Sequence, residues 1–210
     1  MPADVAASLR YVALGDSYTI GTAVPEPERW PNQLVQAVGG AGGPLRLTGN
    51  LAVNGFTSGD LVASELPRLN ELRPGFVTLL VGVNDVVQGV PDETYRAHLE
   101  TIFEALLGRL PPARVLAVTT PDYTVTPAGA DYGDPTERRA GIVRANDSLS
   151  AAAESRGIAV VDIFDLSHRA ATDRSLVAAD GLHPSGSQYA LWVERIAPAV
   201  RALLSRWAQL

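Results

Sequence analysis

Four short segments, far apart in the sequence, contain the residue types that acyl transfer by a serine requires. They are Gly15-Asp16-Ser17, Ser58-Gly59-Asp60, Gly82-Val83-Asn84-Asp85 and Asp180-Gly181-Leu182-His183-Pro184. A serine hydroxyl is a weak nucleophile at neutral pH and needs a neighbouring base. Histidine meets that need because its unperturbed pKa lies near ~6.5. A carboxylate must then orient the imidazole and stabilise its charged form.

The same segments also offer hydrogen-bond donors for a tetrahedral intermediate. The backbone N–H groups of Ser17 and Gly59 and the side-chain amide of Asn84 are the candidates. Loss of one such donor typically lowers the rate by ~10²–10³. The segments therefore predict a nucleophile, a base and an oxyanion hole, provided that the fold brings them together.

Alternating strand and helix patterns give the means of bringing them together. Apolar, β-rich segments predict five strands, and apolar residues at spacings of three and four predict the helices between them. The expected strands are 11–14, 45–53, 76–81, 114–119 and 158–163. The expected helices are 30–38, a helix from Ser58 or Ser64 to 72, then 91–110, 137–156 and 185–207, with glycine-rich 39–44 and polar 120–136 as loops.

This alternation favours one doubly wound parallel sheet, and we expect residues 1–210 to form a single domain. Right-handed crossovers place every strand-to-helix connection at the same edge of the sheet. The four segments each follow a predicted strand or precede the last helix, so we expect them to meet at that edge. Ligands bind at the carboxyl ends of strands in such folds.

Composition narrows the functional class. The net charge is -6 and all the positive charge is arginine, which argues against non-specific binding of nucleic acid. Cysteine is absent, so thiolate chemistry and disulfides are excluded. No apolar segment approaches the ~18 residues of a membrane span. We expect a cytoplasmic protein, because Met1 to Arg10 lacks the features of a signal peptide, although a signal peptide removed earlier would leave no trace.

The four segments resemble, in order and in spacing, the motif blocks of the GDSL hydrolases, also called SGNH hydrolases. That family contains esterases, lipases, lysophospholipases and carbohydrate acetylesterases built on a flavodoxin-like sheet. The resemblance spans nearly the whole chain. It implies a three-layer α/β/α sandwich around a five-stranded parallel sheet, and an ester hydrolase that needs no cofactor and no metal.

The resemblance also implies a role for each matching residue. Ser17 corresponds to the nucleophile and His183 to the base. Asp180, three residues before His183, corresponds to the aspartate of the family's DxxH pair. Gly59 and Asn84 correspond to the residues that complete the oxyanion hole beside the Ser17 amide.

One position departs from the family pattern: Tyr18 follows Ser17 where the family name has leucine. We expect this change to alter the floor of the pocket and to leave the chemistry intact. The loop 120–136 is long enough to serve as a binding loop or lid. With Tyr18, three aromatic residues are expected substrate contacts: Phe56, Tyr123 and Tyr132. The substrate is expected to be a small or medium-chain acyl ester, a lysophospholipid or an acetylated carbohydrate, and the oligomeric state stays open.

Several residues have simpler interpretations that must be weighed. Ser58 is an alternative nucleophile, although no neighbouring motif supports it. His98 lies outside the apolar face of its helix and is expected to be exposed to solvent. His168 is expected to lie outside the cleft. Asp16 and Asp60 are expected to organise turns through backbone hydrogen bonds.

Three other classes of protein remain open at this point. A metal-dependent hydrolase would draw on Asp16, Asp85, Asp180 and His183. A nucleotide- or flavin-binding module would share the fold, although the first turn lacks the glycine-rich phosphate-binding pattern. A catalytically inactive small-molecule- or carbohydrate-binding module on the same fold is the third alternative.

Overall fold

A five-stranded parallel sheet forms the centre of the protein. The computed structural model describes residues 8–40 and 42–207 of the chain. The strands run in the order β2-β1-β3-β4-β5, the order of flavodoxin-like sheets. Their bounds are β1 Leu9–Gly15, β2 Leu45–Asn50, β3 Phe76–Leu80, β4 Val115–Val118 and β5 Ala159–Val161. The predicted fold class is confirmed. The second strand is shorter than the predicted 45–53, since it ends at Asn50.

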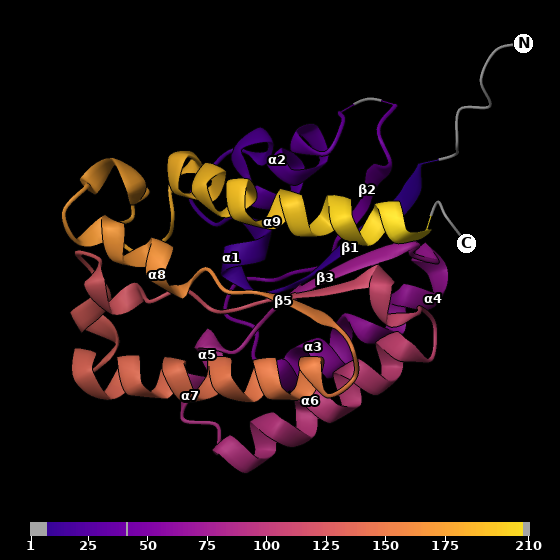
Figure 1. Cartoon of the computed structure of the whole chain (residues 1–210). Helices are drawn as coiled ribbons and strands as arrows, with labels where there is room; N and C mark the ends of the chain where they lie inside the picture. Colours follow the sequence, from indigo (N-terminus) through magenta and orange to yellow (C-terminus); the bar gives the residue numbers. More distant parts are fainter. Residues whose placement is uncertain (1–7, 41, 208–210) are drawn as a thin grey trace, which may run out of the picture.

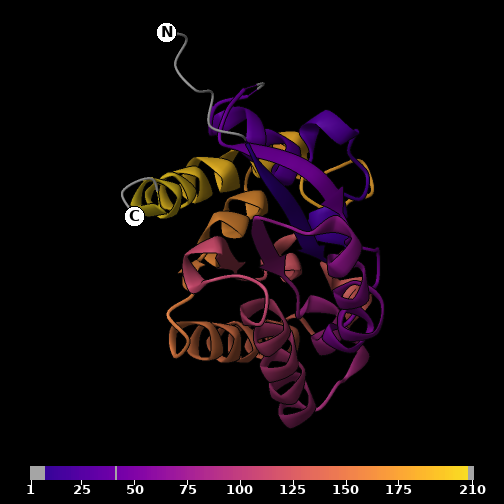
Figure 2. The ribbon, with the colours of Figure 1, turned by 90° about the vertical axis from the view of Figure 1, so that its right-hand side faces the viewer.

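Helices cover both faces of the sheet. Helices α2 and α9 pack on one face, whereas α3, α6 and α7 lie on the other (Figures 1 and 2). Their bounds are α2 Trp30–Ala37, α3 Ser58–Ser64, α6 Asp92–Leu107, α7 Pro135–Glu154 and α9 Gly186–Trp207. The result is the three-layer arrangement that the sequence predicts.

Alternate side chains of β1 pack into the two apolar layers on either side of the sheet. Tyr11 and Ala13 belong to the layer that contains Trp30 and Trp192, whereas the neighbouring Val12 packs in the layer of α3 and α6. Both faces of β1 are thus buried, which explains its uninterrupted apolar sequence. Burial of each large apolar side chain contributes about 1.5–3 kcal/mol to folding. These two layers fix the strands whose carboxyl ends bear the candidate site.

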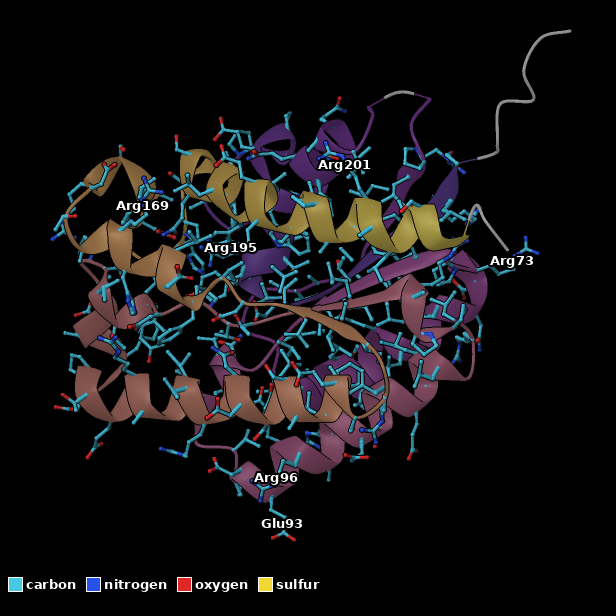
Figure 3. The ribbon with its side chains drawn as sticks, in the orientation of Figure 1. Arg73, Glu93, Arg96, Arg169, Arg195 and Arg201 are labelled. Carbon is cyan, nitrogen blue, oxygen red and sulfur yellow. The ribbon has the colours of Figure 1, made fainter. Side chains whose placement is uncertain are left out.

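Arginines on the outer side of α9 bind to the neighbouring helices (Figure 3). Arg195 pairs with Asp165 in α8 (Phe164–Ser167), and Arg201 donates to the Ala37 carbonyl at the end of α2. Solvent-exposed pairs of this kind contribute at most ~1 kcal/mol each. The apolar face of α9, rather than these contacts, therefore provides most of the energy that holds it on the sheet.

The helix predicted to run from Ser58 or Ser64 to residue 72 is interrupted. Helix α3 ends at Ser64, a 3₁₀ turn covers Leu66–Arg68, and α4 (Leu69–Leu72) completes the segment. Pro67 lies inside the 3₁₀ turn, and proline removes a backbone donor that a continuous α-helix would use.

Two predicted loops are more ordered than the sequence suggests. Residues 83–88 form a short helix, α5 (Val83–Gln88), directly after β3. The loop 120–136 contains 3₁₀ turns at Tyr123–Val125 and Gly129–Tyr132. Although the loop is polar, its Tyr123 is buried in the layer of α2 and α9.

Some predictions fall wholly or partly outside the described residues. Residue 41 of the loop 39–44 and residues 1–7 of the amino-terminal segment are among them. Within the ranges that the structure describes, no helix is both long enough and apolar enough to span a membrane.

The registers of the strands determine which segments meet. Gly15 of β1 pairs with Leu80 of β3, and Ala13 pairs with Asn50 of β2. The three strands thus end at nearly the same level. The segments that follow them begin side by side at the carboxyl edge, and α1 (Ser17–Ile20) and α5 lie there (Figure 1).

Candidate active site

A cavity of about 200 Å³ lies at the carboxyl edge of the sheet. Four of the residues predicted from the motifs line it together: Ser17, Tyr18, Asn84 and His183. They come from three separate segments of the chain. The remaining walls are small polar, aliphatic and aromatic residues: Thr22, Asn54, Gly55, Val83, Val87, Tyr123, Tyr132 and Leu182.

Ser17 is the first residue of α1, in a turn whose backbone only glycine suits. Gly15 has a φ of +147°, and a Cβ there would lie 2.1 Å from the Leu80 carbonyl oxygen. Asp16 caps the helix by accepting a hydrogen bond from the Tyr18 N–H at 3.0 Å. The prediction that Asp16 organises the turn is confirmed. This turn holds the Ser17 side chain at the cavity while only 5% of the residue is exposed.

Two buried carboxyl groups lie beneath the Ser17 turn. Glu65 Oε2 accepts a hydrogen bond from the Gly15 N–H at 3.0 Å, and Asp16 is fully buried. Burial raises the pKa of Asp16 to about 8, and the nearby charge of Asp85 adds to this rise. Burial likewise raises the pKa of Glu65 to about 8, with a contribution from Asp16. Near neutral pH both groups are therefore mostly protonated, which limits the negative charge beside Ser17.

His183 is held by Asp180 in the segment before α9. Its Nδ1 lies 2.6 Å from Asp180 Oδ2, and its backbone N–H donates to Asp180 Oδ1 at 3.0 Å. Partial burial alone would raise the pKa of Asp180. Hydrogen bonds from the Leu182 N–H and from His183 outweigh that effect and lower the pKa. An ionised Asp180 fixes the imidazole with Nδ1 as donor and leaves Nε2 as an acceptor.

Asn84 lies in the first turn of α5 rather than in the predicted loop. Its Nδ2 donates to the Phe56 carbonyl at 2.9 Å, which joins α5 to the segment that leads into α3. An amide nitrogen carries two protons, so Asn84, which also lines the cavity, keeps a second proton to donate.

Gly59, the third oxyanion candidate, lies at the start of α3 against His98. A Cβ on Gly59 would lie 3.0 Å from His98 Cε1, so only glycine fits without displacing the imidazole. Thr57 and Asp60 form a capping box at the start of α3, as the turn role predicted for Asp60 requires.

Aromatic side chains form much of the wall around Ser17. The Tyr18 ring lies 5.6 Å from the His183 ring and 6.2 Å from Trp192, between centroids. Tyr123 and Tyr132 pack edge to face at 5.9 Å. Phe56 is the exception among the predicted contacts. Asn54 and Gly55 line the cavity instead, and Phe56 contributes its carbonyl to Asn84.

The structure corrects the prediction for His98. It is half-buried, not exposed, and its Nδ1 lies 2.9 Å from Ser58 Oγ. Ser58 is itself fully buried and donates to Asp85 Oδ1 at 2.5 Å. A hydroxyl enclosed in this way has no access to substrate, so the structure places the alternative nucleophile outside the cavity.

His168 lies outside the cavity, as expected. Its Nε2 lies 3.1 Å from Asp122 Oδ2. The Asp122 backbone N–H in turn donates to Ser167 Oγ, which joins the loop 120–136 to α8.

The acidic residues considered for metal binding do not gather at one place. Among residues 8–40 and 42–207, no group of three or more histidine and acidic side chains is placed to hold a metal ion. The polar groups around Ser17 instead hold backbone N–H groups or histidine.

Comparison with solved structures identifies proteins with the same fold. An acetylxylan esterase from Geobacillus stearothermophilus superposes with a TM-score of 0.71 at 18% identity, over 93% of this chain and 95% of that one. A lipolytic protein of the G-D-S-L family from Veillonella parvula gives a TM-score of 0.69 at 18% identity, over 89% and 94%. This chain therefore shares the fold of these two proteins.

The sequence identifies the family of the chain. The profile of the GDSL-like lipase/acylhydrolase family matches residues 13–191, and the chain belongs to that family. A protein described as an arylesterase from Vibrio mimicus is 29% identical over 104 residues, 48% of this chain and 50% of that protein. That match covers about half of the relative's length.

Sequence reasoning missed the residues that support the site from behind. The sequence suggests only a metal site for Asp85 and a solvent-exposed position for His98, and it indicates no role for Glu65. The available signal was the position of Asp85 directly after Asn84, together with Ser58 directly before Gly59. Residues adjacent to two candidate donors are well placed to connect them.

Proposed function

We propose that the protein hydrolyses carboxylic esters with Ser17 as the nucleophile. The observation that carries this proposal is the shared cavity: Ser17, Asn84 and His183 line it, and Asp180 holds His183 by Nδ1. Among the described residues, Ser17 Oγ forms no hydrogen bond, so its hydroxyl is available to a base. Hydrogen bonds between catalytic groups are often longer before substrate binds.

In the first half of the reaction, Ser17 Oγ attacks the ester carbonyl carbon and its proton passes to His183 Nε2. The carbonyl oxygen becomes an oxyanion, which accepts hydrogen bonds from the Ser17 N–H, the Gly59 N–H and Asn84 Nδ2. Collapse of this intermediate breaks the bond to the leaving alcohol, which takes the proton from His183. Ser17 then carries the acyl group.

In the second half, His183 takes a proton from water, and the hydroxide attacks the acyl carbon. The same three donors hold the second oxyanion. Its collapse releases the carboxylic acid, and Ser17 Oγ recovers its proton from His183. Asp180 stays ionised throughout and stabilises the imidazolium that forms twice in each cycle.

The cavity favours small or medium-chain acyl esters over the other predicted substrates. Its volume of about 200 Å³ lies below the ~300–1,000 Å³ of pockets that enclose drug-sized ligands. Its walls combine tyrosine, valine and leucine side chains, and His183 is its one ionisable member besides the tyrosines among the described residues. Such walls suit an uncharged acyl or aromatic group.

A panel of p-nitrophenyl esters tests this proposal. We expect kcat/KM to be highest for acetyl to hexanoyl esters and to fall at least tenfold for the dodecanoyl ester, because a long chain exceeds the cavity. Ser17→Ala should abolish turnover of every ester while the circular dichroism spectrum stays unchanged. Retained turnover in Ser17→Ala would contradict the assignment of the nucleophile, whereas a preference for long chains would contradict only the substrate class.

A further inference from the structure

Hydrogen bonds join α5 to the segment 55–58, whose last residue begins α3. Gln88 Nε2 donates to the Gly55 carbonyl at 3.0 Å, and Asn84 Nδ2 donates to the Phe56 carbonyl at 2.9 Å. The Ser58 N–H donates to Asp85 Oδ2 at 2.9 Å. Asn84 lies on one side of this junction and Gly59 on the other. The junction therefore determines the spacing between the two.

The innermost contact of the junction contains a serine, an aspartate and a histidine in a fixed order of donors. Ser58 Oγ donates to Asp85 Oδ1 at 2.5 Å, because a carboxylate only accepts. The hydroxyl oxygen then accepts from His98 Nδ1 at 2.9 Å. Ser58 is 0% and Asp85 2% exposed, so water competes little for these bonds.

His98 supports Gly59 as well as Ser58. Its Cε1 occupies the space that a side chain on Gly59 would need, at 3.0 Å from the Cβ position. One imidazole from α6 thus supports the backbone of Gly59 through packing and the neighbouring Ser58 through a hydrogen bond. This arrangement fixes the position of the Gly59 peptide from two directions.

Burial of the Asp85 carboxylate costs desolvation free energy, which an apolar residue at the same place would not cost. Burial raises the pKa of Asp85, and the two hydrogen bonds from Ser58 reverse only part of that rise. An apolar pair of similar size would fill the same space without desolvating a charge. Unlike apolar contacts, hydrogen bonds are directional. Those of Asp85 therefore constrain both the distance and the angle between α3 and α5.

We propose that Asp85, Ser58 and His98 are positioning residues that hold Gly59 and Asn84 at the spacing a tetrahedral oxyanion requires. This inference rests on the oxyanion hole of the proposed function. Catalytic groups must be held within about 0.5 Å of their productive geometry by the residues behind them. A junction that relaxes would leave substrate binding nearly unchanged and would weaken the contacts that matter in the transition state.

Steady-state kinetics of four variants test the proposal on a short-chain p-nitrophenyl ester. Asp85→Ala and Ser58→Ala should each lower kcat about tenfold to 10²-fold and change KM less than threefold. His98→Ala should behave similarly, and His98→Asn, whose amide replaces the Nδ1 donor, should recover most of the loss. Ile102→Val, a core variant on the same helix, controls for lost stability, with melting temperature measured for every variant.

Coupling to Asn84 separates positioning from general destabilisation. Asn84→Ala should lower kcat ~10²–10³-fold by itself. In that background Asp85→Ala should cost less than about fivefold, because one of the two donors that it aligns is gone. Losses that multiply in full, or that follow melting temperature as in Ile102→Val, would overturn the proposal. If Asn84→Ala keeps a normal kcat, the proposed oxyanion hole fails instead, and the two failures are distinguishable.

Discussion

Two of the groups of serine, histidine and aspartate in the described part of the chain lie beside the candidate site, and one of these two meets the cavity. Ser17 and His183 line the cavity, with Asp180 bound to His183. Ser58, His98 and Asp85 lie behind the oxyanion candidates, and their serine is fully buried. The residue types are identical, so the difference between the groups lies in the order of their hydrogen bonds.

In the cavity group, the aspartate binds the histidine, and within residues 8–40 and 42–207 the Ser17 hydroxyl has no hydrogen-bond partner. Asp180 accepts from His183 Nδ1, which leaves Nε2 able to take a proton from Ser17. In the buried group, the serine hydroxyl already donates to Asp85 and accepts from His98. Ser58 is also fully buried, so its hydroxyl has no access to substrate. Order and access, rather than composition, decide which serine can act as a nucleophile.

The largest expected difference between the groups comes from the same substitution in each histidine. Asparagine keeps a donor where Nδ1 was but removes Nε2. His183→Asn should therefore lower kcat at least ~10³-fold, because the base is lost while the bond to Asp180 is kept. His98→Asn should cost less than about tenfold, since its donor to Ser58 is retained. Initial rates with a short-chain p-nitrophenyl ester measure both, and losses of equal size would erase the contrast.

A smaller effect is expected in the dependence of stability on pH. The lowered pKa of Asp180 stabilises the fold above the unfolded value near 3.8, and this stabilisation is lost as pH falls through the lowered pKa. The pKa of Asp85 is shifted in the opposite direction, above 3.8. Its contribution to the stability of the fold therefore weakens as pH rises from that value. The free energy of unfolding of wild type minus that of Asp180→Asn should therefore increase with pH. The same difference for Asp85→Asn should decrease with pH.

Urea unfolding of wild type and the two variants from pH 3.5 to 7 provides the measurement. The comparison of slopes matters here, because each substitution also changes hydrogen bonds by an amount that does not depend on pH. Slopes of the same sign for the two aspartates would show that their environments do not differ as the structure indicates.

Much of the fold was predictable because its signals are local or periodic. The apolar segment of β3 and the apolar spacing of α6 need no knowledge of the rest of the chain. Because the carboxyl ends of parallel strands lie at one edge of the sheet, the sequence also predicts that Ser17, Asn84 and His183 lie close together. These three do line one cavity, and their catalytic roles stay a prediction.

The missed features depend on contacts between distant segments. Nothing in the sequence near His98 reveals that Gly59 and Ser58 will pack against it from a different helix. Glu65 was equally hidden, since its burial beneath Gly15 depends on how α3 lies against β1. Helix α5 escaped prediction because Gly82 ahead of it and Gly89 behind it leave only one and a half turns between two glycines.

We propose Ser17, and not Ser58, as the nucleophile. A fluorophosphonate reacts covalently with an activated serine, and peptide mass spectrometry identifies the modified residue. We predict one equivalent of label on Ser17, no label on the Ser17→Ala protein, and labelling at Ser17 in Ser58→Ala. A label on Ser58, or a label that persists in Ser17→Ala, would contradict the assignment of Ser17 as the nucleophile.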